Sequence, residues 1–172
     1  GSFSVTNGDL TGGAFTLNIQ GLEVTDMEQG SKGYNDLKGH LMSNDFFAAD
    51  SFATAKFEIT AINTYADGSV SDKEEFQSDF APKKASENIV ENPTHTISGN
   101  LTMRGVTKNI SFPASVSMTD NGISANAKFN IDRTAWNLSY GKEADAIDKA
   151  KDKFIYDTVN LELTVAASKA AM

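Results

Sequence analysis

Apolar and polar residues alternate along several stretches of the chain, which is the pattern of a half-buried β-strand. The stretch from 99 to 116 (GNLTMRGVTKNISFPASV) holds two such runs, separated by a turn at Gly105. Their apolar positions are Leu101 and Met103 in the first run, and Ile110, Phe112, Ala114 and Val116 in the second. Two strands with one apolar face each are therefore predicted here.

The same alternation recurs along the chain. The further apolar rows are Phe3 and Val5; Phe15, Leu17 and Ile19; Ala55, Phe57, Ile59 and Ala61; Ile123, Ala125, Ala127, Phe129 and Ile131; and Val159, Leu161, Leu163 and Val165. An Asn-Gly pair at positions 7 and 8 predicts a tight hairpin turn after the first row. About seven strands joined by short turns predict an all-β, antiparallel barrel or sandwich.

Helices are the minor component of this prediction. Apolar spacing favours two short amphipathic helices, over 35–47 and 143–154, lying over an end of the sheet. Between 64 and 93 the pattern lapses into a polar stretch of mixed charge. A loop of this length is often functional or mobile, and its role stays open.

Length and charge narrow the function classes. A chain of 172 residues fits a single domain over 1–172, and no apolar run is long enough for a transmembrane helix. The formal net charge of -8 argues against nucleic acid as a partner. The absence of cysteine excludes disulfides, thiolate catalysis and cysteine-bound metals.

No catalytic or cofactor motif is present. His40 and His95 lack a metal-ligand spacing, and the chain has neither a nucleophile elbow nor a phosphate-binding glycine loop. We therefore expect no enzymatic activity, no metal and no cofactor.

Two arginines stand at the ends of alternating runs. Arg104 and Arg133 could bind the anionic head group of a ligand at a barrel mouth, because a guanidinium matches carboxylate and phosphate oxygens. The alternative is a structural role, in which each arginine caps carbonyl groups or pairs with an acid such as Asp45 or Asp132.

Several sequence segments together resemble the YceI-like family. The segment 39–47 (GHLMSNDFF) is similar to the family's Gly-x-Leu-x-Ser-x-Asp-Phe-Phe, and 99–108 (GNLTMRGVTK) to its Gly-x-Leu-Thr-x-Arg-Gly-Val-Thr-Lys. Ile131 to Thr134 followed by Trp136, and Asp157-x-Val-x-Leu near the end of the chain, match the family in order and spacing.

The resemblance implies a lipocalin-like antiparallel β-barrel of about eight strands. It also implies a bacterial envelope protein, periplasmic or anchored as a lipoprotein, whose apolar cavity binds a polyisoprenoid or another long-chain amphiphile for carriage or sequestration. Compared with the family, we expect the opening strand to be absent here. We therefore expect an unpaired sheet edge beside residues 3–6, through which the chain forms a homodimer.

Whether the barrel is hollow decides between the functions. Small residues at inward positions favour a hollow: Gly99, Ala55, Ala61, Ala114, Ala125 and Ala127. The predicted cavity residues are Phe15, Leu17, Phe46, Phe47, Phe57, Leu101, Met103, Phe112, Phe129, Ile131 and Trp136. In a hollow barrel, Phe112→Ala and Phe129→Ala would each cost under about 2 kcal/mol. A filled barrel would instead indicate a non-catalytic surface or interaction module.

Overall fold

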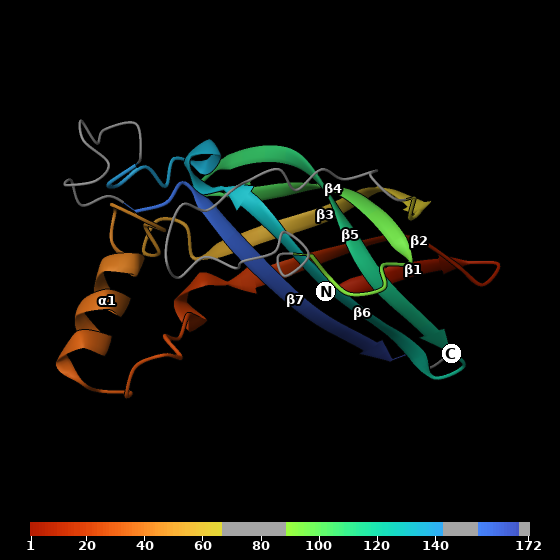
Figure 1. Ribbon diagram of the computed structural model, residues 1–172, viewed down its shortest axis with the longest axis horizontal. Coiled ribbons are helices and arrows are strands. Elements are labelled where there is room, and N and C mark those ends of the chain that lie inside the picture. The colour runs from red at the N-terminus through yellow and green to blue at the C-terminus, as the bar shows by residue number, and fades with distance from the viewer. Residues whose placement is uncertain (67–88, 143–154, 169–172) are drawn as a thin grey trace.

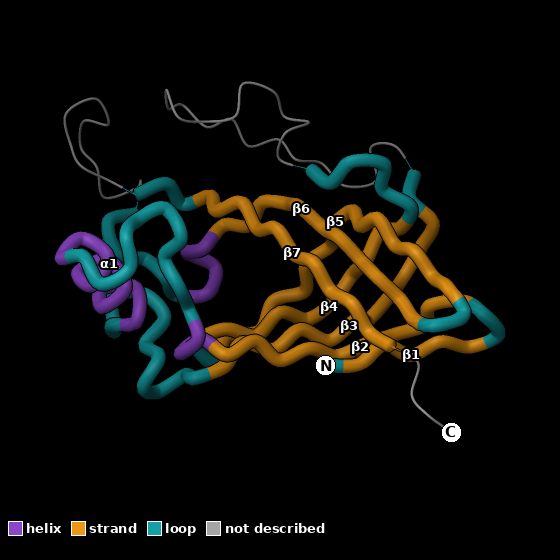
Figure 2. The backbone as a smooth tube through the Cα atoms, turned by 90° about the horizontal axis from the view of Figure 1, so that it is seen from below, coloured by secondary structure: helices purple, strands orange, loops and turns teal. Residues whose placement is uncertain are grey.

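The computed structural model describes residues 1–66, 89–142 and 155–168. Its seven strands form one antiparallel sheet in the order β1-β2-β3-β4-β5-β6-β7, curled into a half-barrel (Figures 1 and 2). The strands are β1 (Ser2–Thr6), β2 (Asp9–Asn18), β3 (Thr54–Thr64), β4 (His95–Met103), β5 (Val106–Thr119), β6 (Gly122–Asp132) and β7 (Thr158–Ser168). The helical elements are η1 (Ile19–Gly21), α1 (Lys32–Met42) and η3 (Arg133–Trp136). The antiparallel fold predicted from the alternation is confirmed, as an open half-barrel in the described residues.

The two ends of the half-barrel differ. The β4–β5 turn, η3 and α1 gather at one end, which we call the closed end (Figure 1). The β1–β2 and β5–β6 turns lie at the other, which we call the open end. Asn7 and Gly8 form the β1–β2 turn with φ values of 53° and 90°, as the Asn-Gly pair predicts.

A bulge in β3 changes which residues face inward. Ile59 pairs with Gly99 and Ala61 pairs with Ser98, so Thr60 is the extra residue. The extra residue inverts the alternation, which turns Ala61 outward and places Ile62 opposite Ile97. The predicted inward position of Ala61 is therefore wrong.

The first predicted helix is shifted and shorter than expected. The helix α1 begins at Lys32, where the Ser31 side chain accepts a hydrogen bond from the Tyr34 N–H, and it ends at Met42 rather than at Phe47. Ile19 belongs to η1 rather than to the strand before it.

The second predicted helix, over 143–154, and most of the 64–93 loop lie outside the described residues. None of the helices described is long and apolar enough to cross a bilayer.

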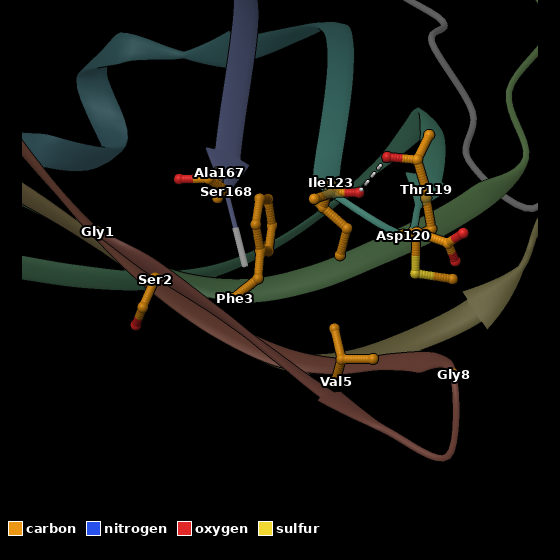
Figure 3. Close-up of a pocket in the computed structure, with 12 residues that line it drawn as sticks. Gly1, Ser2, Phe3, Val5, Gly8, Thr119, Asp120, Ile123, Ala167 and Ser168 are labelled. Carbon is orange, nitrogen blue, oxygen red and sulfur yellow. Dashed lines mark hydrogen bonds between the residues drawn. The ribbon is translucent and has the colours of Figure 1, made fainter. Parts of the chain in front are cut away.

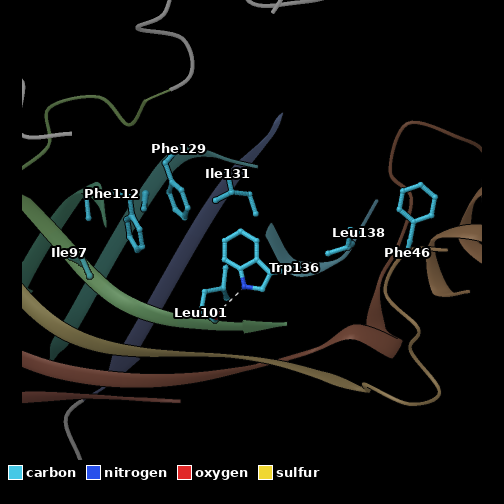
Figure 4. Packing of buried hydrophobic residues seen from close by; sticks show 10 residues of the cluster. Phe46, Ile97, Leu101, Phe112, Phe129, Ile131, Trp136 and Leu138 are labelled. Carbon is cyan, nitrogen blue, oxygen red and sulfur yellow. Dashed lines mark hydrogen bonds between the residues drawn. The ribbon is translucent and has the colours of Figure 1, made fainter. Parts of the chain in front are cut away.

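Phenylalanine rings fill the middle of the half-barrel. The Phe112 and Phe129 rings stack in parallel with centroids 4.1 Å apart, and Phe57 packs on Phe112 at 5.5 Å (Figure 4 shows the Phe112 and Phe129 pair). Phe57 and Phe112 lie on strands separated by β4. Their rings meet because β4 has no side chain at Gly99.

The space at Gly99 is therefore not a gap. A Cβ at this position would lie 2.6 Å from Cε2 of Phe57 and 2.6 Å from the Glu58 carbonyl oxygen. Ala114 and Ala127, which pair across β5 and β6, lie two positions from Phe112 and Phe129 on the same strands and belong to the same buried cluster. At Gly99 the prediction that a small inward residue leaves a gap is therefore wrong, because the Phe57 ring occupies that space.

Truncating Phe112 tests this packing. Phe112 is 4% exposed and touches two other rings, so we expect Phe112→Ala to lower the free energy of unfolding by about 3 to 5 kcal/mol. The control is Phe52→Ala, which truncates a ring that is 37% exposed and which should cost much less. Chemical denaturation measures both. Equal, small losses would mean that the Phe112 ring borders empty space.

Self-association tests the edge strands. Within the described residues, β1 pairs only with β2 and β7 only with β6, so each leaves one edge without a strand partner. We expect the chain to dimerise through β1, because an exposed strand edge templates pairing with another chain. Light scattering over a range of protein concentrations measures this. A monomer mass at every concentration would contradict it.

Candidate functional site

The predicted cavity residues lie in the core of the half-barrel. Six of them belong to the buried cluster, namely Phe46, Leu101, Phe112, Phe129, Ile131 and Trp136. Phe47, Phe57 and Met103 pack against that cluster. Phe15 is half-buried on β2, whereas Leu17 is 44% exposed near the end of the same strand. Most of these side chains therefore touch one another.

Trp136 anchors the closed end of this core. Its indole is 2% exposed, and its Nε1–H donates a hydrogen bond of 3.0 Å to the Leu101 carbonyl oxygen (Figure 4). Phe46 enters the same cluster from the turn that follows α1. The indole N–H is thus satisfied by a strand carbonyl rather than directed at an open space.

Arg104 joins three separate segments at the closed end. Its Nη1 donates to the Asn137 carbonyl oxygen at 2.6 Å, and its Nη2 donates to the Asn44 carbonyl oxygen at 3.1 Å. Asn44 and Arg104 lie in two of the segments that carry the family resemblance, and Asn137 directly follows the third. The φ of 47° at Arg104 and of 72° at Gly105 form the tight turn that directs the side chain there.

Arg133 is buried and surrounded by acceptors. Its Nε donates to the Tyr156 carbonyl oxygen at 2.9 Å, and its two other nitrogens donate to the carbonyl oxygens of Leu138 and Ile155. The same guanidinium pairs with Asp157 at 3.3 Å. The contacts of both arginines thus support the structural alternative, and the acid that pairs with Arg133 is Asp157 rather than Asp132 or Asp45. Asp45 contacts His40, and Asp132 caps η3.

A second polar group lies on α1, also away from the open end. Tyr34 is buried and donates a hydrogen bond to Glu23, and Lys38 contacts both residues. The hydrogen bonds from Tyr34 and then Lys38 lower the pKa of Glu23, and the bond to Glu23 raises the pKa of Lys38. This group ties the segment before α1 to the helix. The described residues hold no cluster of three or more His, Asp or Glu that could bind a metal.

An apolar pocket of about 520 Å³ opens between the edge strands at the open end (Figure 3). Its apolar side chains come from β1, β5, β6 and β7, and they are Phe3, Val5, Met118, Ile123 and Ala167. Phe3 and Ile123 project toward each other in this space (Figure 3). The remaining lining residues are Gly1, Ser2, Gly8, Thr119, Asp120, Gly122 and Ser168.

None of the eleven predicted cavity residues lines this pocket. The alternation places Phe3, Val5 and Ile123 at apolar strand positions, but nothing local distinguishes them from core residues. The available signal was the continuation of alternation to the strand end, from Val116 to Met118. Val5 and Met118 remain 51% and 40% exposed, so this end of the inner face is not covered by other described side chains.

Removing Arg133 tests its role. We expect Arg133→Ala to lower the free energy of unfolding by at least about 2 kcal/mol, because several carbonyl groups lose their donor. Arg133→Lys should not restore it, since an ammonium cannot reproduce the guanidinium fork. Binding of a long-chain alcohol and of the carboxylate of equal length should change by the same factor. A selective loss of carboxylate binding in a stably folded variant would instead indicate a head-group site.

Comparison with known structures supports the fold. A Campylobacter jejuni YceI protein aligns with a TM-score of 0.59 and 16% identity over 95% of this chain and 75% of its own. A mutant CJ YceI protein with a monobromobimane guest aligns at 0.62 and 16% identity, over 99% and 80% of the two chains. Burkholderia cenocepacia BcnA aligns at 0.58 and 18% identity, over 96% and 81%.

The sequence comparisons agree with the structural ones. Among proteins with curated descriptions, no sequence relative is found. The YceI-like domain matches residues 1–167, which is nearly the whole chain. This chain therefore belongs to the YceI-like family.

Proposed function

We propose that this protein binds and carries a long-chain amphiphile, without catalysis, and that the open-end pocket holds part of the hydrocarbon chain. The observation that carries the proposal is an apolar pocket lined by side chains that stay exposed, above all Val5 and Met118. Family membership favours two ligand classes, isoprenoids and fatty chains.

Size and polarity support this choice. A volume of about 520 Å³ lies within the range of small-molecule sites, which are mostly apolar with a few polar groups. Each methylene buried from water contributes about 0.8 kcal/mol, so a short length of hydrocarbon stabilises the complex without any ionic contact.

The packed core sets how far the ligand reaches. Because Phe57, Phe112 and Phe129 occupy the middle of the half-barrel, the hydrocarbon lies at the open end rather than along the full length. The same packing favours the second candidate function, a non-catalytic interaction module with a filled core. An interaction module does not require the pocket to bind hydrocarbon, so a binding experiment distinguishes the two candidate functions.

The proposed setting is the bacterial envelope, either in the periplasm or attached through a lipid anchor. Two of the compared YceI-fold proteins come from bacteria, Campylobacter jejuni and Burkholderia cenocepacia. In this setting the proposed task is to carry an amphiphile between membranes. A homodimer formed through β1 would place two pockets close together, since Phe3 and Val5 belong to that strand.

Charged substitutions in the pocket test the proposal. We expect Val5→Asp and Met118→Asp each to weaken binding of a pyrene-labelled long-chain alcohol by more than about tenfold, because a carboxylate in the pocket must lose water when the hydrocarbon enters. Fluorescence titration below the critical micelle concentration measures the affinity. Both side chains are exposed in the unliganded chain, so the variants should fold.

Leu17→Asp is the matched control. Leu17 is as exposed as the two pocket residues but lies on β2 outside the pocket, so its substitution should change the affinity less than about twofold. Stronger loss in Leu17→Asp than in the pocket variants would move the site to the sequence-predicted cavity. No measurable binding by the parent protein would favour the interaction module.

A further inference from the structure

The lining of the open-end pocket contains one acidic side chain and no basic side chain among the described residues. Among its lining residues in the described structure, Asp120 alone carries a charged side chain. Asp120 lies in the β5–β6 turn, is exposed, and forms no hydrogen bond or ion pair with another described residue. Thr119, beside it, already donates its hydroxyl to the Gly122 carbonyl oxygen at 3.3 Å (Figure 3). The pocket rim therefore offers a free anionic acceptor.

The lysine and arginine side chains of the described residues lie outside the pocket. Arg104, Arg133 and Lys142 belong to the closed end, and Lys32 and Lys38 to α1. The remaining described lysines occupy the halves of their strands nearer the closed end, and they are Lys56, Lys108 and Lys128. Both arginines are moreover engaged by backbone carbonyl groups. Among the described residues, no cationic side chain therefore lines the pocket.

The β1–β2 turn adds to this asymmetry. Asp9 directly follows Gly8, which lines the pocket, so a second carboxylate lies at the same end of the half-barrel. The chain as a whole carries a formal charge of -8. An anionic head group at the pocket mouth would meet this field without a cationic side chain of the described residues to compensate it, whereas a hydrogen-bond donor or a cation would be stabilised by Asp120.

We propose that the amphiphile bound in this pocket has a head group that carries no negative charge and donates hydrogen bonds, such as a long-chain alcohol or amine, with Asp120 as the acceptor. This inference rests on the proposed function and specifies its ligand class. It reverses the sequence-based expectation, in which arginines receive an anionic head group, because the arginines and the pocket lie at opposite ends of the sheet.

The test compares three ligands of equal chain length: a primary amine, an alcohol and a carboxylate. Each competes with the pyrene-labelled alcohol at pH 8 and low ionic strength, where the carboxylate is ionised and charge effects are least screened. We expect the parent protein to bind the amine and the alcohol at least about tenfold more tightly than the carboxylate. Asp120→Asn should narrow this gap, and Asp120→Lys should close or invert it.

Two further variants serve as controls. Glu162→Gln removes an acid from the exposed part of β7, outside the pocket, and should leave the ligand order unchanged. Lys169 follows Ser168 in the sequence and lies outside the described residues, so Lys169→Gln separates its charge from that of Asp120. Equal carboxylate and alcohol affinities in the parent, or an order that Asp120→Lys leaves unchanged, would overturn the inference.

These outcomes are separate from failure of the proposed function. If Val5→Asp weakens alcohol binding but substitutions of Asp120 do not change the order of the three ligand affinities, the pocket binds hydrocarbon and only the head-group inference is wrong. If Val5→Asp leaves alcohol binding unchanged, the pocket itself is not the site.

Discussion

The contact between the Phe57 ring and the backbone at Gly99 governs the packing of this half-barrel. Any side chain at position 99 would collide with the Phe57 ring. Because Gly99 has no side chain, the Phe57 ring can lie over β4 and contact the Phe112 ring on β5. The stacked pair of Phe112 and Phe129 then carries the packing on to β6. A row of rings thus holds together strands that are not neighbours in the sheet, and it occupies the space beside Gly99.

This packing separates an end with many hydrogen bonds between distant segments from an end with an accessible apolar face. At the closed end, Arg104 and Arg133 bind carbonyl groups of the loops that gather there, and Trp136 binds a carbonyl group of β4. The segments that identify the family are therefore largely those that assemble this end. At the open end the inner face continues into exposed apolar side chains, and there the pocket lies. Family-defining residues and proposed ligand-binding residues are thus different sets.

The sequence predicted the positions of the strands better than the side-chain contacts between them. Alternation is a local property, so it located β4, β5 and β6 and the inward positions of Phe112 and Phe129 correctly. The bulge at Thr60 inverted the alternation at Ala61, and no local pattern marks an extra residue whose effect depends on the partner strand. The filling of the Gly99 position and the pairing of Arg133 with Asp157 are long-range contacts, which single-residue patterns do not encode. The resemblance supplied the fold family, but it pointed to the buried core rather than to the pocket.

Methionine methyl groups offer the most direct test of where the ligand lies. Met118 lines the pocket, whereas Met42 ends α1 and Met103 ends β4, both at the closed end. With methyl-labelled methionine, a long-chain alcohol carrying a nitroxide on its hydrocarbon should broaden the NMR signal of Met118 at concentrations that leave Met42 and Met103 sharp. Broadening of Met103 or Met42 ahead of Met118 would place the ligand at the closed end and contradict the account.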